Sequence, residues 1–484
     1  MSSYRETDFG VSAHRAANIP NDGLIRYRVP GNQERLLLTS PKAISEVLVT
    51  KNYDFQKPAA FRWSLGRILG IGVLLAEGDE HKRQRKNLLP AFAFRHVKDL
   101  YPVFWNKAKE LVHAVTEQVR ADALASANRE GGPEKDTANP RAVVELAGWA
   151  SRATLDIIGV AGLGRDFGAI KEPDNPLNRT YRAVFQPSRQ ASFLNLLGLF
   201  MPGWFVTNLP IKRNDDINLA SAVIRDACRD LVREKREKLE RKELTDVDIL
   251  SVAMESGGFS NEDLVDQMMT FLAAGHETTA SALQWAVYLL CLHPEVQARL
   301  RDEIRERLPS ANSHEDVTSL DIDRMPYLSA VCNEVLRYYS PVPMTQREVR
   351  VDTTILGQHV PRGTRVILCP WSVHRDFSLW GEDAGKFNPE RWLAKDETDG
   401  ARTGLGGATS NYAFLTFMHG PRSCIGMGFA KAEFACVLAA LVGRFAFELK
   451  NKEEYDEKNL EIKGAVTARP AKGLWVYATA LDGW

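Results

Sequence analysis

The chain has 484 residues, of which 44% are hydrophobic and 26% charged, as in globular proteins rather than in disordered, collagen-like or coiled-coil chains. Lysine plus arginine and aspartate plus glutamate both number 62, so a broad basic surface for nucleic acid is not expected. The six cysteines form no CxxC pair and show neither zinc nor disulfide spacing, which favours reduced thiols in a cytosol-facing protein.

Residues 1–22 are polar and contain neither a signal peptide nor a membrane anchor. No repeat and no long linker follows, so residues 23–484 are expected to form a single domain. Gly, Ser and charged residues predict three loops, over Ser126–Pro140, Leu308–Thr318 and Lys395–Asn411.

Helices dominate the pattern. Apolar residues at helical spacing, with charged outer faces, predict helices over His81–Leu89, Phe104–Arg120, Val143–Gly159 and Leu219–Lys242. Short β segments in pairs are predicted at Leu24–Val29, Arg35–Thr39, Thr353–Leu356 and Arg365–Leu368. The fold class expected is therefore mainly α with a small segregated β portion, an α+β arrangement.

One predicted helix is unusually long. Ser260 and Asp263 resemble a capping box at its start, and the pair His293-Pro294 stops it. The span of about 32 residues would extend ~48 Å. Such a helix is expected to cross the whole molecule.

A second apolar stretch, Gln190–Ile211, has no charged residue, but Pro202, Gly203 and Pro210 prevent a spanning helix. It is interpreted either as a buried loop region or as a surface that dips into a membrane interface. In the second case Trp204 and Phe205 would lie at the headgroups.

The strongest chemical signal is the segment Phe417–Gly426. A lone cysteine is most often a small buried apolar residue, but Cys424 directly precedes an apolar helical run, Met427–Val442. The helix N-terminus favours a thiolate there. Gly426 lets a flat group approach, and Arg422 can pair with a carboxylate of that group. A thiolate ligand to iron with an arginine for a propionate is what heme-thiolate chemistry needs.

Phe417–Gly426 matches every fixed position of Phe-x-x-Gly-x-Arg-x-Cys-x-Gly, the heme-binding loop of the cytochrome P450 family, which the chain therefore resembles. The pattern Glu334-x-x-Arg337 and the later segment Phe387-Asn-Pro-Glu-Arg391-Trp also match. The resemblance implies that Glu334, Arg337 and Arg391 pair in a structural role. It covers about Gly23 to Val476 and is most similar to filamentous-fungal, microsomal-type members.

The long helix contains Ala-Gly-His-Glu277-Thr278-Thr, which is similar to the family segment that runs over the open heme face. Taken alone, it would be a kink with a satisfied threonine. The resemblance implies that Gly275 leaves room for dioxygen and that Glu277 and Thr278 handle protons and ordered water.

Three further residues are candidates for the heme propionates. His81 and Arg85 lie four apart on one helix face and match the family's His-x-x-x-Arg form, and Arg347 falls where the family often has another arginine. The alternative for the helix is a solvated basic face. Its remaining cations, Lys82, Arg83 and Lys86, are expected to stay free for an acidic redox partner.

The resemblance implies a monooxygenase that carries heme b with Cys424 on the iron. It would oxidise a lipophilic small molecule with O2 and NADPH-derived electrons, in fungal secondary-metabolite biosynthesis. The partners implied are an NADPH–cytochrome P450 reductase-type flavoprotein and cytochrome b5. The location implied is the cytosolic face of the endoplasmic reticulum membrane, or the cytoplasm if the short N-terminus is genuine.

Two alternatives remain: a heme-thiolate isomerase or dehydratase acting on a peroxide, and a non-catalytic heme-binding protein. The substrate pocket is expected to be mainly apolar. Its expected lining is Phe61–Leu75, Ala191–Leu209, the long helix, Pro341–Gln346 and Ala465–Ala468, with Arg62, Arg67 and Gln346 as polar contacts.

Overall fold

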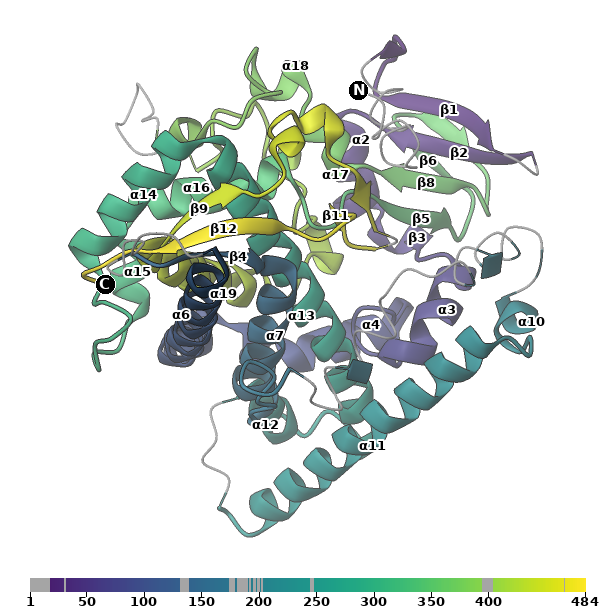
Figure 1. Cartoon of the computed structure of the whole chain (residues 1–484). Coiled ribbons are helices and arrows are strands. Elements are labelled where there is room, and N and C mark those ends of the chain that lie inside the picture. The colour runs from purple at the N-terminus through teal and green to yellow at the C-terminus, as the bar shows by residue number, and fades with distance from the viewer. Residues whose placement is uncertain are drawn as a thin grey trace.

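The computed structural model describes residues 18–29, 32–130, 139–173, 179–180, 190, 193–194, 197, 201, 203–243, 248–393, 404–464 and 466–484. Helices make up most of this structure, and the strands are gathered in small separate sheets, which confirms the predicted α+β class (Figure 1). The longer helices are α3 (Ala59–Leu69), α4 (Gly78–Leu88), α6 (Tyr101–Glu130), α7 (Leu146–Ile157), α11 (Lys212–Glu240), α13 (Asn261–Leu292), α14 (Pro294–Arg307), α16 (Pro326–Tyr338) and α19 (Met427–Arg444).

Helix α13 is the long helix that the sequence predicts. The Ser260 hydroxyl accepts from the Asp263 amide and the Asp263 carboxylate accepts from the Ser260 amide, each at 3.1 Å, so the capping box is present. The helix has 32 residues and ends at His293, where Pro294 begins α14. Most of its side chains are buried, and it runs through the middle of the molecule (Figure 1).

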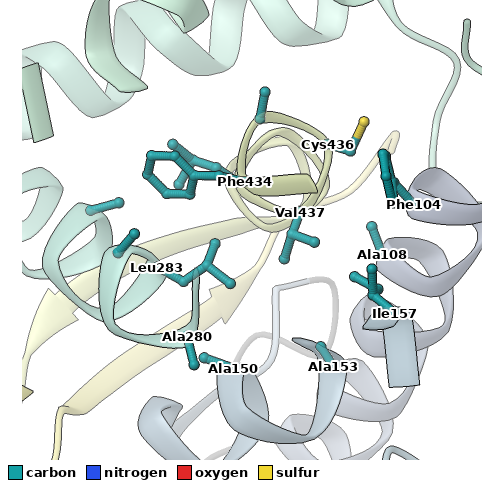
Figure 2. Packing of buried hydrophobic residues seen from close by; sticks show 14 of the residues in the cluster. Phe104, Ala108, Ala150, Ala153, Ile157, Ala280, Leu283, Phe434, Cys436 and Val437 are labelled. Atoms are coloured by element: carbon teal, nitrogen blue, oxygen red, sulfur yellow. The ribbon is translucent and has the colours of Figure 1, made fainter. Parts of the chain in front are cut away.

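Helix α13 packs against α19 and α7 through small and branched side chains. Figure 2 shows Ala280 and Leu283 of α13 lying between Ala150 of α7 and Val437 of α19, and all four are buried. Small residues let helix backbones approach closely. The position of α13 is thereby tied to α19, the helix that follows the Cys424 segment.

The largest sheet has the strand order β1-β2-β8-β5-β3 and lies to one side of the helices (Figure 1). Strand β2 pairs with β8 in parallel, and the other neighbours are antiparallel. The pairing of β3 with β5 sets Gln56 opposite Glu348. The next residue, Lys57, therefore comes level with Arg347. The strands are β1 (Leu24–Val29), β2 (Gln33–Leu38), β3 (Phe55–Gln56), β5 (Thr345–Val349) and β8 (Arg365–Leu368).

Three smaller sheets complete the described strands. β12 (Trp475–Ala480) lies between β4 (Arg141–Glu145) and β9 (Phe445–Leu449). β6 (Thr353–Ile355) pairs with β7 (Gln358–Val360), and β10 (Ile462–Lys463) pairs with β11 (Arg469–Pro470).

Two predictions of local structure were wrong. Val143 to Glu145, predicted as the start of a helix, belong instead to strand β4, because they pair with β12; the helix α7 begins only at Leu146. Helix α6 runs on to Glu130, into the predicted loop Ser126–Pro140, and its last turns are rich in alanine, a strong helix former. The loop Leu308–Thr318 is confirmed, whereas part of Lys395–Asn411 lies outside the described residues.

Much of the uncharged stretch Gln190–Ile211 also lies outside the described residues, which include its short helix α10 (Gly203–Thr207). Within the part of the chain that the structure describes, no helix combines the length and apolar character needed to cross a bilayer.

Candidate active site

The segment that carries Cys424 is closed into a tight loop before α19. The Cys424 amide donates to the Phe417 carbonyl at 2.8 Å, and the 3-10 turn η8 (Gly420–Arg422) lies between them. Gly420 has a φ of +75°, and a Cβ there would lie 2.1 Å from the Leu48 carbonyl oxygen. Only glycine fits, so the loop can rest directly on the chain at Leu48.

Cys424 differs from the other cysteines in its exposure: its side chain is exposed, whereas the other five are buried. Surrounding protein nevertheless raises the pKa of the Cys424 thiol by desolvation, and the Gly426 amide and the Arg85 guanidinium offset only part of that rise. The amide at the helix start acts in the predicted direction and lowers the pKa of the Cys424 thiol, but desolvation outweighs it. A cation bound to the sulfur is needed to ionise it, and iron would do so.

Arg85 and His81 lie on α4, beside the Cys424 loop. Arg85 donates from Nη1 to the Ser423 carbonyl at 2.7 Å and from Nη2 to the Ser423 hydroxyl at 3.1 Å. His81 is buried, and its Nδ1 lies 3.5 Å from the Tyr53 hydroxyl. Burial and nearby cations, Arg422 foremost, lower the pKa of His81 to about 3, so the imidazole is neutral. The solvated basic face is thus excluded for these two side chains.

Arg422 and Arg347 are both buried but have different partners. Arg422 forms an ion pair with Glu77 and donates from Nε to the Asn52 side-chain oxygen at 3.2 Å. Arg347 donates from Nη1 to the Thr345 hydroxyl at 3.2 Å and to the Gln346 carbonyl at 2.9 Å. No carboxylate is within ion-pair distance of Arg347 among the described residues.

A largely buried cationic cluster, defined here as Lys57, Arg347 and Arg422, lies next to the neutral His81; the two arginines are buried and Lys57 is half-buried. Burial and the Arg347 charge lower the pKa of Lys57 to about 7, and burial and the Arg422 charge lower that of Arg347 to about 10. Glu77 is the carboxylate that acts on both. The cluster therefore carries more buried positive charge than its one carboxylate balances, and it fits a ligand with carboxylates of its own, such as the heme propionates.

Sequence reasoning missed Lys57 and Glu77 in this cluster. Lys57 is level with Arg347 because of the β3–β5 register, and the sequence does not show which strands pair. The position of Lys57 in the cluster could therefore be found only from the structure. Within the described residues, no group of three or more His, Cys, Asp or Glu side chains is arranged to hold a metal ion.

One short part of α13 is more exposed than the rest of that helix. Ala274 is exposed and Thr278 is half-buried, although the turns on both sides are buried. The Thr278 hydroxyl donates to the Ala274 carbonyl at 2.8 Å. The Glu277 carboxylate accepts from the Thr467 hydroxyl at 2.9 Å and pairs with Arg469 at 3.4 Å. The two predicted side chains are therefore adjacent but point to different partners.

Gly275 also lies in a close helix contact. A Cβ on Gly275 would lie 2.9 Å from the end of the Ile158 side chain, in the π-helical segment η5 (Ile158–Gly162). Glycine therefore lets α13 pack closely on η5. The role in leaving room for dioxygen stays a prediction.

The predicted structural triad is present and is buried. The Glu334 carboxylate accepts from Arg337 Nε at 2.8 Å and Nη2 at 2.7 Å, and from Arg391 Nε at 3.2 Å. It also accepts from the Trp392 indole at 2.9 Å and the Asn388 amide at 2.8 Å. Five donors therefore converge on one carboxylate, and they join α16 to the 3-10 turn η6 (Pro389–Trp392).

The prediction that Lys82 and Arg83 stay free was wrong, and Arg67, a predicted polar contact of the pocket, already has partners. Lys82 pairs with Asp79 at 2.8 Å and Arg83 with Glu80 at 2.7 Å, so both are already engaged along α4. Arg67, expected in the pocket, instead donates to Asn214 at 3.2 Å and to Asn218 at 2.7 Å, which joins α3 to α11. In each case a local hydrogen-bonding partner holds the side chain.

A long helix beside an exposed cysteine loop, a largely buried cationic cluster and a Glu-Arg-Arg lock define a heme-thiolate protein. Residues 24–475 match the family model described as cytochrome P450, and the chain belongs to that family. Its cofactor is therefore heme, supplied with electrons by a reductase.

Three of its similar relatives are fungal proteins. The chain is 46% identical to the cytochrome P450 monooxygenase sphH of Aspergillus fumigatus, over 99% of this chain and 85% of the relative. It is also 46% identical to ALT8 of Alternaria alternata, over 96% of this chain and 84% of that protein, and 46% identical to FUM15 of Gibberella moniliformis, over 95% and 82%. Both are also named cytochrome P450 monooxygenases.

Proposed function

We propose that this heme-dependent monooxygenase oxidises a lipophilic small molecule of fungal secondary metabolism, using O2 and electrons from NADPH, and that residues 23–484 act as one catalytic domain. The observation that carries the reaction type is the exposed Cys424 thiol in its closed loop, near a cationic cluster that has more positive charges than its one carboxylate, Glu77, balances. The fungal origin of the relatives supports the biological setting.

In this proposal Cys424 holds the heme iron, and Phe417 and Gly426 frame its loop. His81 and Lys57 face one propionate region together with Arg347, while Arg85 braces the Cys424 loop through Ser423. Arg422 reaches the same region and is held there by Glu77. Bound heme supplies the activation of dioxygen, and the protein supplies binding, orientation and electrostatics.

Proton delivery is assigned to Thr278 and Glu277. The Thr278 hydroxyl donates its hydrogen to the Ala274 carbonyl, so its oxygen keeps lone pairs that can accept a hydrogen bond from an ordered water. Glu277 is half-buried, one residue before it, and can exchange protons through ordered water.

The substrate is expected to be lipophilic because apolar side chains from α3 and the following loop meet α13. Leu69 and Leu75 are buried against Ala273, one residue before the exposed Ala274. Gln346 is proposed as a polar contact of the substrate. Arg62, the other candidate, donates from Nε to the Leu75 carbonyl at 2.8 Å. A pocket of this character suits a medium-sized apolar compound.

The partners and location are proposed from the family. Electrons would come from an NADPH–cytochrome P450 reductase-type flavoprotein, with cytochrome b5 as a second donor, at the cytosolic face of the endoplasmic reticulum. Phe193, Met201 and Phe205 are 51%, 43% and 37% exposed, which supports contact of this region with a membrane surface. Replacing Phe193 and Phe205 with Asp should reduce co-sedimentation with liposomes while the CO spectrum stays unchanged.

The test of the iron ligand is Cys424→Ala. The reduced, CO-bound protein should absorb at the wavelength that marks thiolate ligation, and this variant should lose that absorption. The control Cys291→Ala removes a buried thiol from helix α13, away from the Cys424 loop, and should keep this absorption. Heme retained with an unchanged CO spectrum in Cys424→Ala would refute the assignment.

The test of proton delivery is Thr278→Ala, with Thr278→Ser as the control that keeps the hydroxyl. The alanine variant should bind heme and substrate but release several-fold more peroxide per NADPH consumed, because the oxygen of Thr278 is gone. Catalytic NADPH consumption also separates a monooxygenase from a peroxide isomerase or a non-catalytic heme protein, neither of which needs it.

A further inference from the structure

The chain segment Thr467–Arg469 is fastened along one face of α13. The Ser281 hydroxyl donates to the Ala468 carbonyl at 2.6 Å, and the Trp285 indole donates to the same carbonyl at 2.9 Å. On the other side, the Ala468 amide donates to the Pro341 carbonyl at 2.8 Å. Ser281, Trp285 and Ala468 are all buried, so this segment is fixed in place by the core.

Glu277 lies on the same face of α13 as these two anchors. Residues 277, 281 and 285 are four apart, and residues at that spacing are neighbours on one side of a helix. Thr278 is one position further round, on the side where Ala274 is exposed. The fixed segment therefore runs past Glu277 and not past Thr278.

Two side chains of the segment reach the Glu277 carboxylate, one at each oxygen. The Thr467 hydroxyl donates to Oε2 at 2.9 Å, and Arg469 Nη1 lies 3.4 Å from Oε1. Thr467 is buried, and the Glu277 side chain is only 16% exposed. A glutamate without partners would sample several rotamers, whereas a carboxylate bound at both oxygens is confined to one orientation.

We propose that Thr467 and Arg469 are positioning residues that hold the Glu277 carboxylate in the one orientation that it uses for proton delivery. This inference rests on the proposed role of Glu277 in the reaction. Thr467 and Arg469 act through Glu277: they set its orientation, and the proton passes by way of the carboxylate and ordered water. Loss of either contact lets the carboxylate leave that orientation, so protons arrive less efficiently and more of the NADPH-derived electrons are released as peroxide.

The experiment uses the heme-loaded enzyme and measures peroxide released per NADPH consumed. We expect Glu277→Gln, Arg469→Met and Thr467→Val each to raise this ratio several-fold, with an unchanged CO spectrum. Thr467→Ser keeps the hydroxyl and should restore the wild-type ratio. Lys472→Met is the matched control, because it removes an exposed ion pair with Glu461 from the same part of the chain, and it should have no effect.

The double variant Glu277→Gln/Arg469→Met separates positioning from other effects. If Arg469 acts only through Glu277, the double variant should release no more peroxide than Glu277→Gln alone. Thermal unfolding of the four proteins gives an independent measure, and the shifts in unfolding midpoint should be non-additive because the two side chains are in contact.

The possible failures differ in pattern. An unchanged ratio in Glu277→Gln would overturn the proposed role of Glu277 and this inference with it. A raised ratio in Glu277→Gln with wild-type values in Arg469→Met and Thr467→Val would overturn only the positioning role. Additive effects on peroxide release or on the unfolding midpoint would also overturn it.

Discussion

Replacing Glu334 with glutamine tests the buried lock between α16 and η6. Glu334 and Arg337 are both 0% exposed, and Arg391 is 8% exposed. Glutamine has the same shape, but it has no charge, and one of its two terminal groups is an NH2. All five groups that now contact the carboxylate are N–H donors. The NH2 of glutamine would therefore face a donor in either orientation of the amide.

The magnitude follows from the burial of the remaining charge. Arg337 keeps its hydrogen bonds to the carbonyls of His374, Ala384 and Lys386, but its guanidinium loses the carboxylate that neutralises it inside the protein. Breaking a buried ion pair by removing one partner costs about 3–5 kcal/mol. Total stabilities are about 5–15 kcal/mol, so Glu334→Gln should remove a large fraction.

The assay is urea unfolding of the heme-loaded protein, followed by the heme absorption and by circular dichroism. The matched control is Glu390→Gln in η6, the 3-10 turn that Glu334 contacts. The Glu390 carboxylate pairs with Arg299, and both side chains are about half exposed. An exposed ion pair contributes about 0–1 kcal/mol, so this variant should unfold close to the wild type. A loss below about 1 kcal/mol in Glu334→Gln would refute the reasoning.

Two further predictions concern the Cys424 loop and the cationic cluster. Gly420→Ala places a Cβ 2.1 Å from the Leu48 carbonyl oxygen at a φ of +75°, so it should lower the free energy of unfolding by more than ~1–2 kcal/mol and reduce the heme content. The control Gly428→Ala, whose Cβ would have no atom within 4 Å, should change neither. Without bound heme, the pKa of Lys57 is about 7, so its ammonium group loses a proton above that pH. Bound propionates would favour the charged form and raise this pKa. Heme binding should therefore take up a proton above pH 7, and the affinity for heme should fall as the pH rises. The rate of heme transfer to an acceptor globin should therefore increase as the pH rises above 7 in the wild type. In Lys57→Met the transfer should be fast at every pH in this range and should not depend on pH.

The sequence by itself determined the family, the cofactor and the residue expected to bind iron. The Phe417–Gly426 segment, the Glu-x-x-Arg pair and the segment at Phe387 are local patterns, and their residue types carry the chemistry wherever the fold places them. The boundaries of the long helix were also predictable, because a capping box and a proline act within one turn.

Only the tertiary structure decided which groups act on one another. Lys57 and Arg347 are level because β3 pairs with β5, and Glu277 meets Arg469 because a buried carbonyl holds that segment against α13. The pKa of Cys424 is raised, rather than lowered, because desolvation depends on all the protein around the sulfur and not on the one helix that follows it. Burial and long-range pairing are sums over residues far apart in the chain, and no local pattern contains them.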